Sequence, residues 1–205
     1  MEIERKWMVS GWPPPGRDPL PLLWTEYQEQ GYVHATAPIV RIRLEARIDG
    51  GDSISGDRKA PRHSGSGSAT QAAKESVSDE NARYIMCFKS AGYLSREEIE
   101  IEICREEFDR LARLIGRPLI HKIRRVYQLP EDLKLEVNLV DEEYETAFMY
   151  AEVEFDSEKQ ARSFHPADCG LGDYLLDDVT EKPGQSMSAY WTKTRPGASA
   201  RGDLN

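Results

Sequence analysis

The chain has 205 residues, enough for one domain with a sizeable core, alone or with loose segments attached. Its net charge of −9 argues against a general nucleic-acid binder and against a protein that binds anionic membrane surfaces. The three cysteines form no C-x-x-C pair, and no apolar run approaches the roughly 20 residues that span a bilayer. We therefore expect a cytoplasmic protein in which any site for an anion is a local concentration of cations.

The first predicted strand covers residues 1–7. Side chains alternate across a strand, so Glu2, Glu4 and Lys6 share one face while apolar and mixed residues take the other. A half-buried strand with a solvated charged face is the ordinary interpretation of such a pattern.

The same alternation returns along the chain, which weakens that ordinary interpretation. Some of these charged faces are wholly anionic and others wholly cationic. Carboxylates suit hard divalent cations, and arginine and lysine suit phosphates, so a surface that joins both suits a metal–phosphate substrate. The segments concerned are residues 40–44, 98–103, 122–124, 135–139 and 152–155.

A strand predicted over Trp24–Val33 places Tyr32 on the polar face, although a tyrosine packed within the sheet is an equal alternative. In the next strand Arg41 and Arg43 stand about 7 Å apart, close enough to grip neighbouring phosphoryl groups. Two solvent-exposed arginines would be the alternative.

The composition changes between about residues 48 and 83, where glycine and serine are frequent and apolar residues are few. Such a segment buries too little surface to offset its ordering entropy, so we expect a disordered insertion. It lies between the arginine strand and the strand Tyr84–Lys89, which ends in Lys89.

Helical spacing of apolar residues predicts a helix over Cys104–Ile115, ended by Gly116, and a short helix follows over Ser157–Phe164. A strand over Leu119–Leu129 carries Lys122 and Arg124 on one face. The following strands are predicted over residues 133–140 and 149–155, and the second carries Glu152 and Glu154. Residues 193–205 are predicted to be a flexible tail.

Charged groups that face one another at this density require water, ions or ligand between them, as the hydrated interior of a closed barrel provides. The periodicity alone leaves closure of the sheet undecided.

The E-x-E-x-K pattern of Glu2, Glu4 and Lys6 resembles the signature of the CYTH superfamily, the triphosphate tunnel metalloenzymes. Further resembling pieces follow in the family's order over most of the chain. They are residues 30–32, 40–43, 88–90, 95–98, 122–124, 135–138, 151–155 and 178–180. The resemblance implies a mainly β (α+β) fold: a closed antiparallel β-barrel tunnel with a charged lumen and a few helices packed outside. Residues 1–192 would form this domain, interrupted by the insertion at about 48–83.

The predicted function is metal-dependent hydrolysis of inorganic triphosphate, or of another short polyphosphate or nucleoside triphosphate. The predicted substrate grip is Lys6, Arg41, Arg43, Lys89, Lys122 and Arg124. The predicted ligands of Mg²⁺ or Mn²⁺ are Glu2, Glu4, Glu152 and Glu154. The partner is thus a small-molecule triphosphate rather than nucleic acid or membrane, and the sequence also allows a homodimer.

The sequence leaves open which side chain is the base that accepts a proton from the attacking water. Glu152 or Glu154 is one choice, and Lys122 paired with Tyr32 is the other. Adenylyl cyclase and thiamine triphosphatase activities of the same superfamily, and a module that binds polyphosphate or nucleotide without turnover, are the alternative functions.

Two departures from the family pattern bear on these expectations. Asn138 stands where a second acidic residue is frequent, and residues 184–191 lack the basic character common in the family. One metal contact and one phosphate contact would then be missing, unless Lys182 or Lys193 supplies the latter.

Overall fold

A computed structural model describes residues 1–15, 19–48 and 68–196. Its strands are β1 (Glu2–Val9), β2 (Leu22–His34), β3 (Ile39–Ile48), β4 (Ala82–Lys89), β5 (Ser95–Arg96), β6 (Glu98–Ile103), β7 (Ile120–Gln128), β8 (Lys134–Val140), β9 (Phe148–Glu154) and β10 (Asp177–Asp178). Its α-helices are α1 (Ala69–Glu75), α2 (Arg105–Ile115), α3 (Glu158–Ser163) and α4 (Met187–Thr194). Short 3₁₀ turns occupy Pro130–Asp132 and Pro166–Cys169.

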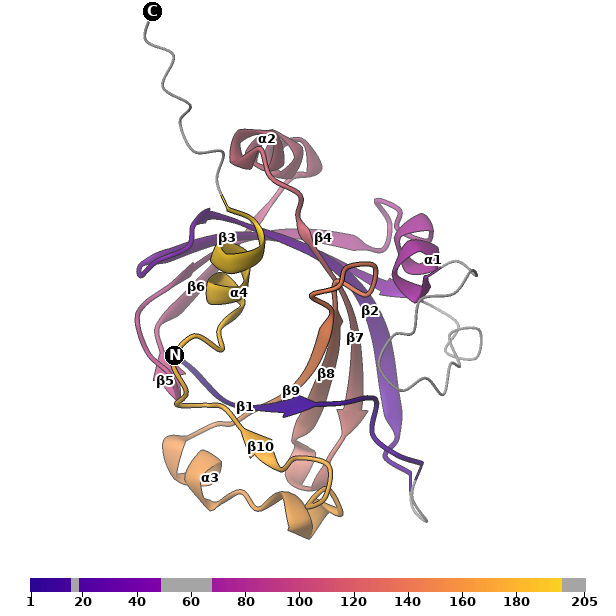
Figure 1. Ribbon diagram of the computed structural model, residues 1–205, viewed down its shortest axis with the longest axis vertical. Helices are drawn as coiled ribbons and strands as arrows, with labels where there is room; N and C mark the ends of the chain where they lie inside the picture. Colours follow the sequence, from indigo (N-terminus) through magenta and orange to yellow (C-terminus); the bar gives the residue numbers. More distant parts are fainter. Residues whose placement is uncertain (16–18, 49–67, 197–205) are drawn as a thin grey trace, which may run out of the picture.

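The strands form one antiparallel sheet that curls into a nearly closed barrel (Figure 1). Around the barrel the order is β10, β1, β9, β8, β7, β2, β3, β4 and β6. The two-residue strand β5 lies near the far edge and pairs back onto β1, with Glu2 opposite Arg96. This pairing closes the ring, as predicted from the family resemblance.

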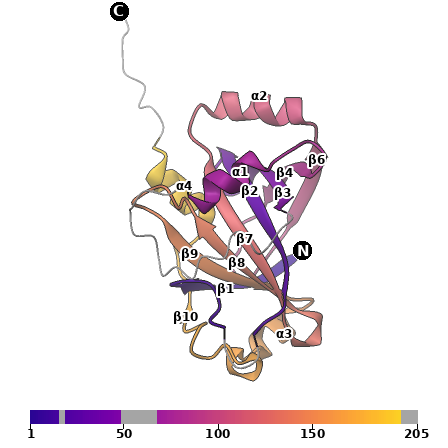
Figure 2. The ribbon, with the colours of Figure 1, turned by 90° about the vertical axis from the view of Figure 1, so that its right-hand side faces the viewer.

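The predicted alternation is confirmed, and the barrel has the predicted charged interior in place of the usual apolar one. The apolar faces of the strands point outward and form the main core under the helices, while the charged faces line the interior. Phe108 of α2 packs on Tyr84 of β4 at a ring distance of 5.4 Å. Phe164, at the end of α3, packs on Trp7 of β1 at 6.0 Å. Helices α2 and α3 therefore cover an apolar outside (Figure 2).

Two predicted boundaries differ from the structure. Residues 49–67 lie outside the described part, but Ala69–Glu75 forms α1, although disorder was predicted there. Thr70 and Ala73 of this helix are buried, and Lys74 pairs with Glu29 of β2 at 2.9 Å. The small and polar residues of this segment give no strong apolar signal, so the pattern did not predict the burial of two small side chains.

The predicted tail also begins later than residue 193. Helix α4 continues to Thr194, and the guanidinium of Arg195 lies 2.6 Å from the carboxylate of Asp141, with both side chains buried. Residues 197–205 lie outside the described part.

Helix α4 packs at one end of the barrel, where the Trp191 ring lies 5.7 Å from that of Tyr32. Gly31 of β2 leaves room for Leu119 and Ile115, because a Cβ there would come within 2.6 Å and 3.2 Å of these side chains. Among the helices of residues 1–15, 19–48 and 68–196, none has the length and apolar character needed to cross a membrane.

Candidate active site in the barrel interior

One cavity of about 710 Å³ occupies the barrel interior. All of the predicted site residues line it, although they come from six different strands. They are Glu2, Glu4, Lys6, Tyr32, Arg41, Arg43, Lys89, Lys122, Arg124, Glu152 and Glu154. The alternation of each strand and the closure of the sheet bring these side chains together.

The cationic side chains are withdrawn from solvent. Lys6, Arg41, Arg43, Lys89 and Lys122 are each at most 9% exposed. Burial of unpaired charge is unfavourable, so each cation needs an anion close by. Carboxylates of the same cavity supply most of these anions.

Arg124 and Lys6 have their partners on β8 and β9. The Arg124 guanidinium lies 2.8 Å from Glu136, and the Lys6 ammonium lies 3.3 Å from Glu152. Burial alone would raise the pKa of Glu152, but the charges of Lys6 and Arg124 outweigh it and lower that pKa. Glu152 is thus held as a carboxylate by cations, which makes it a weak proton acceptor.

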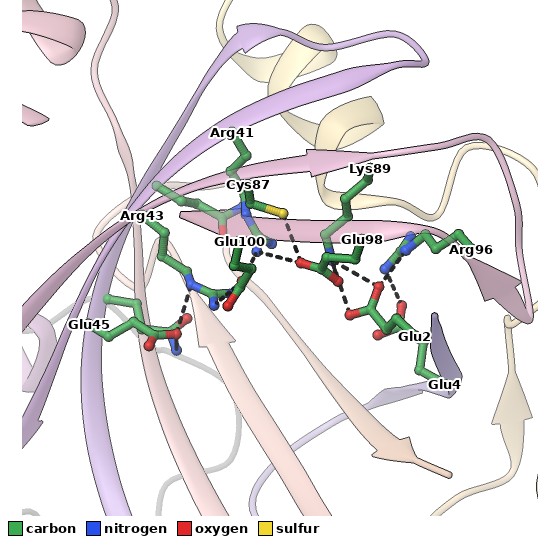
Figure 3. A network of polar contacts seen from close by, with 12 residues as sticks. Glu2, Glu4, Arg41, Arg43, Glu45, Cys87, Lys89, Arg96, Glu98 and Glu100 are labelled. Atoms are coloured by element: carbon green, nitrogen blue, oxygen red, sulfur yellow. Dashed lines mark hydrogen bonds and ion pairs between the residues drawn. The ribbon is translucent and has the colours of Figure 1, made fainter. Parts of the chain in front are cut away.

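Arg41, Arg43 and Lys89 meet the carboxylates of β6 (Figure 3). Arg43 donates to Glu100 at 2.9 Å, and Lys89 lies 2.8 Å from Glu98. The Nη2 atom of Arg41 lies 3.6 Å from both carboxylates, and its Nε and Nη2 atoms have no hydrogen-bond partner among the described residues. Arg41 therefore has donors free for a ligand.

Three carboxylates converge at the junction of β1 and β9. One oxygen from each of Glu2, Glu4 and Glu154 lies within 4.8 Å of the others. Burial and the charge of Glu152 raise the pKa of Glu4 to about 7. Burial and the charges of Glu136 and Glu2 act in the same direction on the pKa of Glu154, which is more exposed and so more screened by solvent.

This repulsion among carboxylates is relieved by a divalent cation, and an all-oxygen donor set suits Mg²⁺ or Mn²⁺. Glu2, Glu4 and Glu154 therefore fit the predicted ion. Glu152, the fourth predicted ligand, lies outside this group and pairs with Lys6.

Lys122 is almost completely buried. Burial and the charges of Arg124 and Arg43 lower its pKa well below the ordinary value of lysine. Its amino group donates to the hydroxyl of Tyr150 at 3.4 Å. The predicted partner, Tyr32, instead accepts a hydrogen bond from Gln30 at 3.0 Å, and burial raises the pKa of Tyr32 to about 12.

Several cavity residues were not assigned a role from the sequence. They are Arg96, Glu98, Glu100, Glu136, Tyr150 and Thr180. Arg96 donates to both Glu2 and Glu4, at 2.6 and 2.7 Å. Tyr150 stands two residues before Glu152, on the same face of β9, so the alternation that identified Glu152 also points to Tyr150.

The structure shows where the two departures from the family pattern lie. Asn138 is fully buried and accepts a hydrogen bond from Arg124 at 3.2 Å, so it positions a cation. Lys182 lines the cavity, together with residues 184–188, whereas Lys193 does not.

No family model matches the chain, and no curated protein matches it. Among solved structures, it is similar to the inorganic triphosphatase NE1496, with 24% identity, coverage of 93% of each chain and a TM-score of 0.48. It is also similar to a putative adenylyl cyclase from Hippeastrum, at 15% identity, covering 84% of this chain and 87% of that one, with a TM-score of 0.47. The PH1819 protein from Pyrococcus horikoshii is 14% identical, with coverage of 79% and 82% and a TM-score of 0.46. In the order of its motifs and in the barrel that they build, the chain resembles the CYTH superfamily.

Proposed function

We propose that this protein is a metal-dependent triphosphatase that hydrolyses inorganic triphosphate or a related short polyphosphate or triphosphate. One observation carries the proposal. The same cavity is lined by the six cationic side chains of the predicted grip, which come from four strands, and by three converging carboxylates. Phosphoryl transfer requires chiefly positioning and neutralisation of charge, and this cavity offers both.

The cations form the substrate grip. Arginine presents a planar fork of donors that matches phosphate oxygens, and lysine adds compact charge. Arg41 and Arg43 on β3, Lys89 on β4, and Lys122 and Arg124 on β7 surround the cavity from one side of the barrel, since β4, β3, β2 and β7 are successive neighbours. Lys6 reaches the cavity from β1. A linear chain of phosphoryl groups is recognised by such a distributed set.

Glu2, Glu4 and Glu154 would hold the Mg²⁺ or Mn²⁺ ion, which when bound neutralises charge on the phosphate oxygens near the bond that breaks. The residues of the chain then act on the water. Its oxygen attacks the terminal phosphorus, the bridging P–O bond breaks, and pyrophosphate leaves as phosphate forms. A base in the cavity accepts the proton.

Two groups are candidates for that base. Glu154 lies in the carboxylate group and has no ion-pair partner within the described residues, whereas Glu152 is held by Lys6. Lys122 has a lowered pKa in the free protein. Bound triphosphate would place negative charge near Lys122 and favour its ammonium form again, so we assign proton acceptance to Glu154 and phosphate binding to Lys122.

The decisive assay measures release of phosphate, pyrophosphate and cyclic nucleotide from triphosphate, ATP and thiamine triphosphate, each with Mg²⁺ and with Mn²⁺. We expect phosphate and pyrophosphate from triphosphate at the highest rate. Cyclic nucleotide from ATP would assign the cavity to an adenylyl cyclase, and the highest rate on thiamine triphosphate would assign it to that substrate. Tight binding of one of these compounds without release of any product would identify the protein as a binding module.

A further inference from the structure

The carboxylates of β6 stand where an anionic ligand of the arginines would lie. Glu98 is within 3.6 Å of Arg41 and 2.8 Å of Lys89, and Glu100 contacts both Arg41 and Arg43. These three cations belong to the proposed grip. In the free protein Arg43 and Lys89 are therefore paired with side chains of the chain itself, Lys89 also with Glu2 at 3.0 Å (Figure 3). Arg41 is held only by charge at 3.6 Å and keeps donors free.

We propose that Glu98 and Glu100 act as resident carboxylates that a phosphate ligand must displace from the cations. They would thereby determine how many phosphoryl groups an anion needs in order to bind in the cavity. The proposal rests on the proposed function only for the identity of the ligand. Displacement subtracts a similar free energy from every anion that takes over these cations. Anions with few phosphoryl groups lose most of their binding in this way, and longer polyanions keep enough contacts to bind.

The local structure allows such an exchange. Within the described part of the chain, strand β6 pairs with β4 on one side only, since closure of the barrel is made by β5. The Glu100 side chain is 40% exposed, so water can solvate its carboxylate when a ligand replaces it as the partner of Arg43. Arg43 keeps a second contact with Glu45 at 2.7 Å, which holds the guanidinium in place during the exchange.

The free protein also needs these anions. Arg41, Arg43 and Lys89 are buried on neighbouring strands, and without the β6 carboxylates their charges would repel. The same residues thus stabilise the empty cavity and oppose ligand binding. Removing a residue with a merely structural role would lower stability without making the anion bind more tightly.

Strand β6 supplies a matched control. Glu102 follows Glu100 on the same face, but it is 65% exposed, pairs with the exposed Arg83 at 3.5 Å and does not line the cavity. Glu102→Gln therefore removes the same charge from the same strand without freeing a cation of the grip.

The test is calorimetric titration of tripolyphosphate and of pyrophosphate into the full-length protein, with chelator present so that no hydrolysis occurs. We expect Glu100→Gln to bind both anions about threefold to tenfold more tightly than the unmodified protein. Glu98→Gln should act in the same direction, and Glu102→Gln should leave both dissociation constants unchanged. Thermal unfolding without ligand should show a lower Tm for Glu100→Gln.

Equal or weaker binding by folded Glu100→Gln and Glu98→Gln would overturn the proposal. If the unmodified protein binds neither anion measurably, appearance of binding in these two variants supports it and continued absence overturns it. Turnover is scored separately with metal present. Binding that follows the expected order without hydrolysis would contradict the proposed triphosphatase function and leave the role of the resident carboxylates standing.

Discussion

The hydroxyl of Tyr150 lies 3.4 Å from the amino group of Lys122, and the ring of the same tyrosine lies 3.6 Å from the amino group of Lys6. One buried side chain on β9 thus positions two cations of the proposed grip, one through a hydrogen bond and one through the face of its ring. Substitutions of Tyr150 can therefore remove the hydroxyl contact with Lys122 alone, or the hydroxyl contact together with the ring contact with Lys6.

Tyr150→Phe keeps the ring beneath Lys6 and removes the hydroxyl at Lys122. We expect KM for triphosphate to rise about threefold to tenfold, because a hydrogen bond to a charged group is lost, with kcat changed less. Tyr150→Leu should raise KM further. Steady-state kinetics at saturating metal measure both values, and a Phe variant identical to the unmodified protein would show that the hydroxyl does not position Lys122.

Lys122→Arg tests the assignment of the base. Arginine keeps the positive charge for phosphate but cannot accept a proton near neutral pH. Since we assign the base to Glu154, we expect turnover to stay within about tenfold of the unmodified protein. If triphosphate binding were normal and turnover fell by several orders of magnitude across the neutral and alkaline range, Lys122 would be the base, because only its neutral amine could accept the proton.

The sequence predicted the interior of the barrel well, for a physical reason. The period-two alternation specifies which residues of a strand share a face, so the pattern alone assigns Glu2, Glu4 and Lys6 to one surface. The residues that pair with these side chains across the barrel were harder to predict from the sequence. Arg96 lies on a two-residue strand with no periodicity of its own, and only closure of the sheet brings it against Glu2 and Glu4.

Other misses have the same origin. The contact between Lys122 and Tyr150 joins residues 28 positions apart on β7 and β9, which are not neighbours in the sheet. The pair of Asp141 and Arg195 joins residues 54 positions apart. Such contacts depend on the registers of several strands, and no local pattern carries that information.

The lowered pKa of Lys122 also predicts how stability depends on pH. Between that lowered pKa and the ordinary value, the unfolded chain binds a proton that the folded chain does not, so this lysine makes stability rise with pH. Lys122→Met removes the buried amine. We expect it to be more stable by on the order of 1 kcal/mol near neutral pH, with an advantage that shrinks as the pH approaches the ordinary pKa of lysine. Denaturant unfolding at several pH values checks this, and a less stable Met variant would contradict it.

The buried pair of Asp141 and Arg195 should hold α4 against the end of the barrel. Asp141 accepts hydrogen bonds from Arg195 and from Tyr190, each at 2.6 Å. Arg195→Met leaves this carboxylate buried without its cation, so we expect a loss of about 3 kcal/mol in the free energy of unfolding. The double variant with Asp141→Asn should recover part of that loss. Equal stability of Arg195→Met and the unmodified protein in urea would show that the pair is not needed.

In the proposed triphosphatase, the carboxylates and the cations of one cavity act on the triphosphate in two separate roles. The most direct measurement is the rate of phosphate release from triphosphate as Mg²⁺ or Mn²⁺ is titrated into the unmodified protein, Glu4→Gln and Arg43→Ala. We expect chelator to abolish turnover, Glu4→Gln to need roughly tenfold more metal, and Arg43→Ala to raise KM about tenfold at an unchanged metal requirement. Turnover that persists in chelator, or a Glu4→Gln variant with the metal requirement of the unmodified protein, would contradict the account.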